Sequence, residues 1–443
     1  MMMTPHDLKQ QAQQQLAQQA SLDWLSLPQK AQATFAALDM PTRKTEAWKY
    51  TPLTALLNTP YFAHTAAGQV DESAAADRLG QLGDVSRLVF VNGHLHPGLS
   101  SYSDLENQGI VTLFSNANDA QRELINAELG TAFEPQQHVF ATLNYSCIED
   151  GVLIQAPTDF KVQQPIQLVY LSSGEAQPAL AQSRVLVYGA AGSSLELIEQ
   201  YDSLGETNVF HNQMTEISLQ PNARLTHLRL QVEHESLSQV NGLHVKLAAG
   251  SHYEQHALAF GSALKRNDIN INFNGSNAYC RLNGVFLSKH KQHIDNHLNL
   301  EHGVPHCNSD TVYKGFITDS SRAVFNGRIH IHKHAQKTEA HLNNKNLLLS
   351  KQAELDTKPE LEIYADDVKC SHGASIGKLD DKSLFYFQSR GIDRATAEAM
   401  LCLGFVNEMV EQFPNTAVIE LARQRLAEFF NDVDQLNHLW TLE

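Results

Sequence analysis

The sequence predicts a mainly β protein in which a long array of strands lies between two helical regions. Residues 150–375 have strand character almost throughout, and residues 227–232 alternate strictly between polar and apolar side chains. Small or polar corner residues recur along this region. Helical patterns are confined to residues 5–58, a short stretch near 120, and the chain after residue 380.

The spacing of the corners favours a solenoid over a sandwich. The predicted corners begin at Gly192, Pro221, Ala249, Gly275, Asp319 and Lys351. The first four are separated by 26 to 29 residues, within the range of repeat architectures. A strand array without intervening helices cannot be a doubly wound α/β fold. In a β-helix, each rung covers the apolar face of the rung before it.

The chain divides into three predicted domains. With 443 residues it is too long for one ordinary compact core. We expect a mostly helical N-terminal domain over residues 1–135, which also holds short strands near 88–91 and 110–114. A β-helix core follows over 136–379, and a helical C-terminal domain over 380–443.

Composition and charge exclude several functional classes. The formal charge of 33 − 49 = −16 disfavours binding to nucleic acid or to an anionic membrane. No segment reads as a signal peptide or a membrane span, so a cytoplasmic location is expected. The cysteines form no C-x-x-C pair, which favours a reducing compartment and disfavours a complete metal site within this chain. They are Cys147, Cys280, Cys307, Cys370 and Cys402.

Two apparent motifs are weak evidence for a functional site. Residues 373–379 resemble a phosphate-binding loop but have three residues between the glycines and Leu379 after the lysine, so no nucleotide site is expected. His330, His332 and His334 would share one face of a strand. Such a row could bind a metal, and a metal-dependent enzyme built on it is the alternative function. We favour a polar row that faces away from the core.

Cys370 and His372 form the sharper candidate site. In an extended strand both project to the same side, with Ser371 on the other. A thiolate and an imidazole are two ligands for iron or zinc, and Lys369 would modestly favour the thiolate. Two ligands do not complete a site, so the others must come from elsewhere. A Cys/His nucleophile pair and a merely buried cysteine are the competing interpretations.

The predicted helix over 393–411 is apolar on two sides. One stripe contains Ala397, Met400, Leu401, Gly404 and Phe405, and the other contains Ala399, Cys402, Leu403, Val406 and Val410. A helix packed on one side needs only one stripe. We therefore expect the second stripe to meet either a neighbouring helix or a partner protein.

Four segments resemble a known family. The segment 44–51 is similar to the N-terminal signature of the SufD branch of the SufB/SufD family. The segments 346–350 and 365–374, followed by 384–392, resemble the signature that SufB and SufD share. His372 after Cys-Ser favours the SufD branch. Ser375, where threonine is common, is a mild departure.

The resemblance implies a non-catalytic scaffold for iron–sulfur cluster assembly with a right-handed parallel β-helix. It implies pairing with a SufB-type paralogue and docking of a SufC-type ABC ATPase on the C-terminal domain, where we assign Met400, Leu401 and Phe405. A transient cluster would form at the paralogue interface, with His372 as a shared metal ligand beside Cys370. No cofactor is expected to be bound stably by this chain alone. Flavin is associated with the family's complex, but the sequence contains no flavin fingerprint, so we make no prediction of flavin binding by this chain.

Two further interpretations stay open at this point. Exposed strand edges would also allow a homodimer when the paralogue is absent. A purely structural adaptor, in which Cys370 and His372 take no part in chemistry, is the third functional interpretation.

Overall fold

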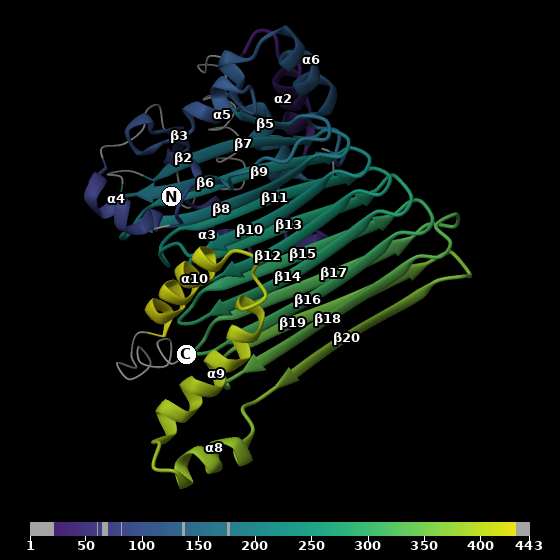
Figure 1. Ribbon diagram of the computed structural model, residues 1–443. Helices are drawn as coiled ribbons and strands as arrows, with labels where there is room; N and C mark the ends of the chain where they lie inside the picture. The colour runs from purple at the N-terminus through teal and green to yellow at the C-terminus, as the bar shows by residue number, and fades with distance from the viewer. Residues whose placement is uncertain are drawn as a thin grey trace.

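The computed structural model describes residues 22–59, 61–63, 70–80, 82–134, 138–174 and 178–430. Its centre is a parallel β-solenoid whose chain passes alternately through two sheets (Figure 1). The odd sheet contains β5 (Val152–Ala156), β7 (Ala179–Gly189), β9 (Val209–Leu219), β11 (Ser238–Leu247), β13 (Leu264–Phe273), β15 (His293–His302), β17 (Arg322–Ile331) and β19 (Glu354–Ile363). The even sheet contains β6 (Ile166–Ser173), β8 (Ser194–Leu204), β10 (Arg224–Gln231), β12 (His252–Ala259), β14 (Tyr279–Ser288), β16 (Asn308–Ile317), β18 (Glu339–Leu348) and β20 (Lys369–Gly377). The predicted β-helix is confirmed.

All six predicted corners lie between strands. The first four connect the odd sheet to the even sheet, and they stack through backbone hydrogen bonds such as Gly192 N to Pro221 O and Asn222 N to Ala249 O, both 2.9 Å. Asp319 and Lys351 instead connect the even sheet back to the odd sheet. The interval before Asp319 is therefore longer because this corner lies on the opposite side of the solenoid from the first four.

The interior of the solenoid is partly polar. On β10, Leu228 and Leu230 point outward, whereas His227 and Arg229 are buried inside. The Arg229 Nε donates to Glu199 Oε2 at 2.9 Å, and His227 Nε2 lies 3.1 Å from the same oxygen. Burial alone would raise the pKa of Glu199, but Arg229 and His227 hold it well below its usual range. Paired charges and hydrogen bonds thus fill space that most cores give to apolar groups.

The N-terminal region covers one end of the solenoid (Figure 1). Its helices are α2 (Leu27–Ala37), α3 (Thr54–Leu57), α4 (Glu72–Leu79), α5 (Ser103–Asn107), α6 (Asp119–Glu128) and α7 (Val139–Ser146), with 3₁₀ turns at Glu46–Trp48, Pro97–Leu99 and Phe114–Asn116. Its strands are β1 (Phe62–Ala63), β2 (Ser86–Val91), β3 (His94–Leu95) and β4 (Val111–Leu113). Because β2 pairs with β6 and β4 pairs with β5, the strands predicted near 88–91 and 110–114 extend both sheets. The first part of the predicted N-terminal helical stretch lies outside the described residues.

The segment 44–51 is anchored on the outer face of the odd sheet. The guanidinium of Arg266 lies 3.8 Å from the centre of the Trp48 ring, and its Nη1 donates to Ala47 O and to Asp295 Oδ2, both at 2.7 Å. Thr51 also donates to Asp295. The signature near the N-terminus therefore has a packing role in this fold.

The C-terminal region contains three helices: α8 (Asp381–Ser389), α9 (Arg394–Val410) and α10 (Thr416–Phe429). The helices α9 and α10 pack on the outer face of the even sheet, whereas α8 packs against α9. Asp393 caps α9 as predicted, accepting a hydrogen bond from Thr396 N at 3.0 Å. Leu228, Leu230 and other outward residues of the even sheet form one apolar cluster with α9 and α10. No helix in the described part of the chain is long and apolar enough to cross a membrane.

Candidate functional site

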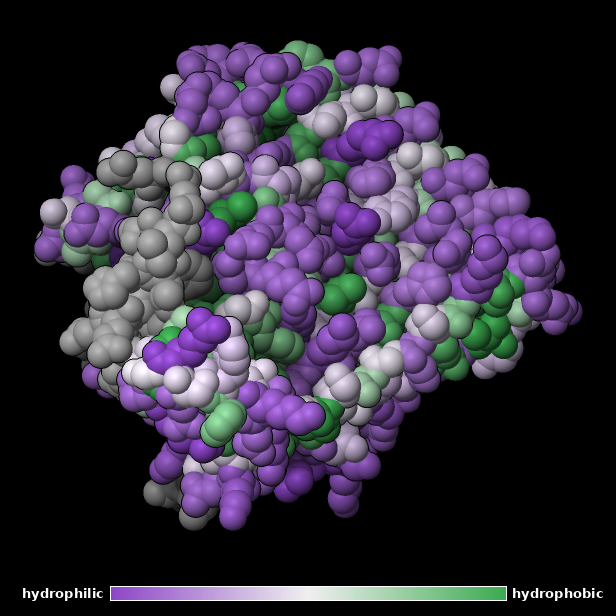
Figure 2. Space-filling view, turned by 60° about the horizontal axis from the view of Figure 1, so that its bottom comes forward, coloured by the Kyte–Doolittle hydropathy of each residue, from purple (hydrophilic) through white to green (hydrophobic). Residues whose placement is uncertain are grey.

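The end of the solenoid opposite the N-terminal region is open. β19 and β20 are the edge strands of their sheets, and all side chains of β20 are at least partly exposed. Three large apolar residues lie exposed there: Ile363, Tyr364 and Ile376, at 41%, 61% and 51% of their full areas. Figure 2 brings this end forward and shows apolar patches within a mostly hydrophilic surface. Unpaired strand edges with exposed apolar side chains are a template for pairing with another chain.

Cys370 and His372 lie on this open turn. In the register of β18 and β20, Cys370 pairs with Ala340 and His372 pairs with Leu342. Ala340 and Leu342 belong to the core inside the solenoid, so Cys370 and His372 share the face that continues this core. Ser371 points to the other side, where its hydroxyl lies 2.7 Å from Nδ1 of His341. The predicted alternation of these three residues matches this register.

The two side chains differ in environment. The His372 residue is exposed, whereas Cys370 is half-buried and packs against the core. Partial burial raises the pKa of the Cys370 thiol, outweighing a backbone hydrogen bond from Ala340. The thiolate that Lys369 was expected to favour is therefore disfavoured in this chain alone. A change of environment at Cys370 would be needed to populate it.

The pair does not complete a metal site within this chain. Among the described residues, the only group of three or more His, Cys, Asp or Glu side chains placed to hold a metal is Glu301, His330 and His332. Cys370 and His372 thus remain a two-ligand arrangement on an exposed surface. Sites for iron–sulfur clusters generally use four ligands, so a second chain could supply the rest.

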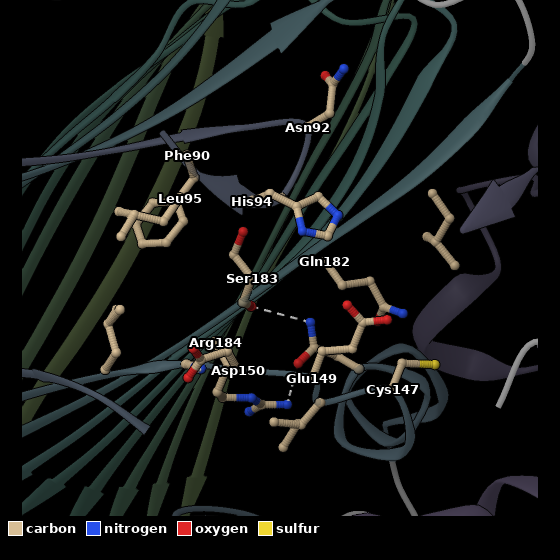
Figure 3. A pocket seen from close by; sticks show the side chains of 16 residues that line it. Phe90, Asn92, His94, Leu95, Cys147, Glu149, Asp150, Gln182, Ser183 and Arg184 are labelled. Carbon is tan, nitrogen blue, oxygen red and sulfur yellow. Dashed lines mark hydrogen bonds between the residues drawn. The ribbon is translucent and has the colours of Figure 1, made fainter. Parts of the chain in front are cut away.

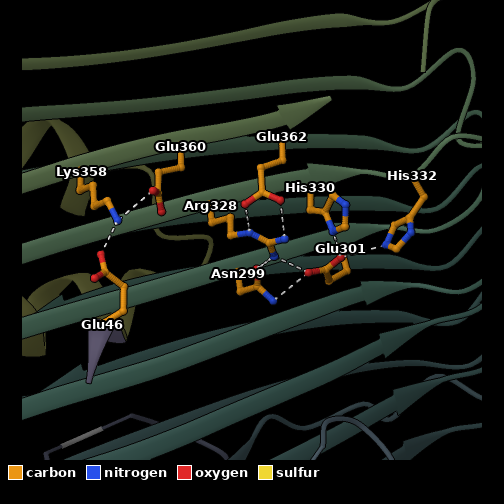
Figure 4. A network of polar contacts seen from close by, with 9 residues as sticks. All are labelled: Glu46, Asn299, Glu301, Arg328, His330, His332, Lys358, Glu360 and Glu362. Atoms are coloured by element: carbon orange, nitrogen blue, oxygen red, sulfur yellow. Dashed lines mark hydrogen bonds and ion pairs between the residues drawn. The ribbon is translucent and has the colours of Figure 1, made fainter. Parts of the chain in front are cut away.

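The histidine row is only partly assembled. Ile329 and Ile331 are fully buried, so His330 faces outward from β17 as expected. β17 ends at Ile331, and His334 lies exposed in the turn that follows. The predicted three-histidine row is therefore not a single strand face. His330 and His332 instead approach Glu301 of β15 (Figure 4). Sequence reasoning missed Glu301.

The two apolar stripes of α9 have different neighbours. Cys402, Val406 and Val410 are buried in the cluster shared with the even sheet. Met400, Leu401 and Phe405 are only half-buried. Phe405 is further covered by Lys314, whose Nζ lies 4.6 Å from the ring centre.

The neighbouring helix α8 adds exposed aromatic area that the sequence analysis did not assign. Phe385 and Tyr386 are 72% and 55% exposed. The sequence feature that could have indicated these exposed side chains is a run of four apolar residues, 384–387, in a helix too short to bury all of them. Exposed aromatic side chains next to a half-exposed apolar stripe are typical of a binding surface.

A cavity of about 250 Å³ lies between the β2–β3 hairpin, the end of α7 and β7 (Figure 3). Cys147 lines it, but burial raises the pKa of this thiol to about 12. Arg184, also in the wall, is held by Glu216 at 3.0 Å and stacks on the Tyr145 ring at 3.9 Å. These contacts are structural, and a protonated thiol is a poor nucleophile.

Comparison with known proteins gives a consistent result. Residues 170–405 match the family model described as "SUF system FeS cluster assembly, SufBD core domain", and residues 4–168 match "SufBD protein N-terminal region". The chain is 33% identical to the iron–sulfur cluster assembly protein SufD of Escherichia coli, covering 88% of this chain and 89% of that protein. It is 29% identical to a SufBD family protein of Synechocystis, covering 89% of each chain. It is also 29% identical to the chloroplastic protein ABCI7 of Arabidopsis thaliana, covering 89% of this chain and 83% of that protein.

Proposed function

This chain belongs to the SufBD family of iron–sulfur cluster assembly proteins, and we propose on that premise that it is a non-catalytic scaffold subunit. It pairs through the open edge of its solenoid with a SufB-type paralogue and carries a SufC-type ATPase on its C-terminal helices. The nascent cluster forms between the two scaffold chains. In this proposal the protein acts in the cytoplasm and holds the cluster only transiently.

The observation that carries this proposal is the position of His372. Its imidazole lies on the last strand of the solenoid, on the face that continues the buried core, with Cys370 two residues away. One chain thus presents two borderline-to-soft ligands at a surface built for strand pairing. A paralogue that extends the solenoid would bring its own ligands opposite them. Its approach would also change the environment of the Cys370 thiol.

The ATPase surface has separate support. Met400 and Leu401 of α9 are half-exposed, and Phe385 and Tyr386 of α8 are exposed. The opposite stripe of α9 is already occupied by the solenoid. A partner on the outer side would therefore leave the fold of the scaffold unchanged. Met400 and Leu401 remain our proposed contacts, and Phe405 contributes less because Lys314 covers part of its ring.

The proposal is tested on the complex purified from cells that express all three proteins. His372→Ala removes the imidazole from an exposed position, so the complex should still assemble and hydrolyse ATP. Its iron and sulfide content should fall sharply. The matched control is His341→Ala, which removes an imidazole that is 44% exposed, from the adjacent strand and on the opposite face of the sheet. That variant should retain normal cluster.

Two results would contradict this assignment. Normal iron and sulfide in the His372→Ala complex would remove His372 from the cluster site. Equal losses in the His372→Ala and His341→Ala complexes would indicate a general disturbance of the open edge. Failure of the chain to co-purify with a paralogue and an ATPase would overturn the scaffold role itself.

A further inference from the structure

A second group of metal-binding side chains lies on the outer face of the odd sheet, away from β20. It contains Glu301, His330 and His332 (Figure 4). We propose that these three residues bind a divalent first-row transition metal ion through one carboxylate oxygen and two imidazole nitrogens. This proposal does not depend on the scaffold function, and it involves neither Cys370 nor His372.

The solenoid brings these residues together by its repeat. β15 and β17 are neighbours in the odd sheet, and Glu301 pairs directly with His330 in their register. The residues flanking them in sequence point inward, since Leu300, His302, Ile329 and Ile331 are fully buried. Both members of the pair must therefore face outward. His332, the first residue after β17, reaches the same carboxylate.

The donor atoms already converge on one point. His330 Nδ1 lies 2.7 Å and His332 Nε2 lies 2.9 Å from the same oxygen, Glu301 Oε2. All three ligand atoms lie within 4.8 Å of one another, and the two imidazole rings are 4.2 Å apart. Ligands at about 2.0 to 2.2 Å from a shared ion lie at comparable separations. Small side-chain adjustments would let one ion replace the two N–H hydrogen bonds.

The carboxylate of Glu301 is held in place from its other side. Its Oε1 accepts hydrogen bonds from Arg328 Nη1 at 2.5 Å and from Asn299 Nδ2 at 3.2 Å. Supporting contacts of this kind orient a ligand and raise metal affinity. Oε2 is therefore the oxygen left to face the histidines.

The positive charge of Arg328 would oppose cation binding if it were unpaired. It is paired, because its Nε and Nη2 donate to the two oxygens of Glu362 at 2.7 and 2.9 Å. Glu362 lies on the next strand, β19. Arg328 thus bridges two carboxylates, Glu301 and Glu362, and this group of three side chains keeps one net negative charge that would favour a cation. Figure 4 shows this row of contacts running across three strands.

The ligand set selects the class of metal. Imidazole nitrogens disfavour Mg²⁺ and Ca²⁺, which prefer oxygen ligands. A structural zinc site would need a fourth protein ligand. Two imidazoles and one carboxylate leave coordination positions open, and the half-exposed His332 side chain (49%) leaves them accessible to water or another ligand.

The test is metal binding by the purified full-length chain after removal of metal with a chelator. Zn²⁺ is titrated by calorimetry, and Co²⁺ is added as a spectroscopic probe whose visible absorption reports nitrogen coordination. The wild-type chain should bind one equivalent at this site. His332→Gln and Glu301→Gln should each lower the affinity by at least about tenfold, and the Co²⁺ absorption should weaken accordingly.

The chain offers a matched control in His334, two residues from His332 and exposed but outside the cluster. His334→Gln should bind Zn²⁺ and Co²⁺ like the wild type. The His372→Ala variant is titrated with the same metals, to detect any metal ion that binds at the open edge instead. The proposal is wrong if His332→Gln binds as tightly as the wild type, if His334→Gln or His372→Ala loses the same equivalent, or if excess Mg²⁺ displaces Co²⁺ efficiently. Equal melting temperatures of the variants without metal would show that folding is not the cause.

Discussion

His372 of β20 lies directly opposite Leu342 of β18, so an exposed imidazole occupies the position that a buried leucine fills one turn earlier. The same relation holds between Cys370 and Ala340. The last turn therefore continues the geometry of the solenoid, with a thiol and an imidazole at positions that are apolar one turn earlier. In the proposed function, a second chain would cover this turn.

The partial exposure of Cys370 predicts that it reacts before the other cysteines, which are buried. We expect iodoacetamide, applied to the native chain at about pH 8, to modify Cys370 first, though more slowly than a free thiol because the pKa of Cys370 is raised. The other four cysteines should react much later, because burial raises the pKa of each: Cys147, Cys280, Cys307 and Cys402. Peptide mass spectrometry gives the order of modification. Early labelling of another cysteine would contradict the arrangement described for β20.

The exposed aromatic surface of α8 predicts a contact with the ATPase. Phe385→Asp should weaken ATPase binding by about 10- to 100-fold, since a charge without a partner in a desolvated contact is costly. Stability should change by no more than about 0.5 kcal/mol, because Phe385 is 72% exposed. Phe160→Asp is the matched control, with an exposed aromatic residue on the loop between β5 and β6. Equal affinities of the two folded variants would remove α8 from the interface.

The turns of the solenoid could be predicted from sequence because they depend on local chemistry. Residues such as Gly192 and Asn222 adopt positive φ angles, of 69° and 61°, which few residue types accept readily. The direction of the two faces of β10 could not be predicted. Alternation on β10 separates Leu228 from His227, but only the helices packed outside explain why the leucine points outward. A polar residue can lie inside when its partners lie one turn away.

The candidate sites show the same limit. The shared face of Cys370 and His372 follows from the period of two along one strand. The approach of Glu301 to His330 depends on pairing between strands 29 residues apart in the chain. That separation equals one of the corner spacings, so the repeat length in the sequence indicates that Glu301 and His330 lie side by side. Applying the corner spacing to every histidine would have placed Glu301 beside the row.

Buried His211 predicts a loss of stability in acid. Both ring nitrogens lack a hydrogen-bond partner among the described residues, and burial lowers the pKa of His211 from 6.5 to about 4. Between these values the unfolded chain binds a proton that the native chain does not. The free energy of unfolding should therefore fall by about 2 kcal/mol between about pH 7 and about pH 5 on account of this residue.

His211→Phe should remove this contribution, and urea unfolding at the two pH values measures it. Asp202 acts in the opposite direction, because burial raises its pKa to about 6 and its protonation favours the native state. Both proteins contain Asp202, so the difference between them isolates His211. Equal pH dependence of wild type and variant would show that the native state accommodates the charged imidazole.

The last prediction concerns the anchor of the N-terminal signature, the buried pair of Arg266 and Asp295. Their side chains are 2% and 0% exposed and 2.7 Å apart. Burial alone would raise the pKa of Asp295, but His297 and Arg266 hold it well below its usual range. Arg266→Leu removes this cation and the group stacked on Trp48. The variant should lose about 3 to 5 kcal/mol of stability, because it leaves a buried charge poorly paired.

A double-mutant cycle separates the pair from its surroundings. Arg266→Leu combined with Asp295→Leu should be more stable than Arg266→Leu alone, since the second change removes the unpaired charge. The matched control is Arg281→Leu, which breaks a 3.4 Å ion pair with Glu254 in which the arginine is 41% exposed. That change should cost less than about 1 kcal/mol. If Arg266→Leu costs no more than the control, or if the two changes at the buried pair are additive, then Arg266 and Asp295 do not anchor the signature segment. Its attachment would then have to come from its other contacts, such as the packing of Trp48 and the 3.1 Å ion pair between Glu46 and Lys358.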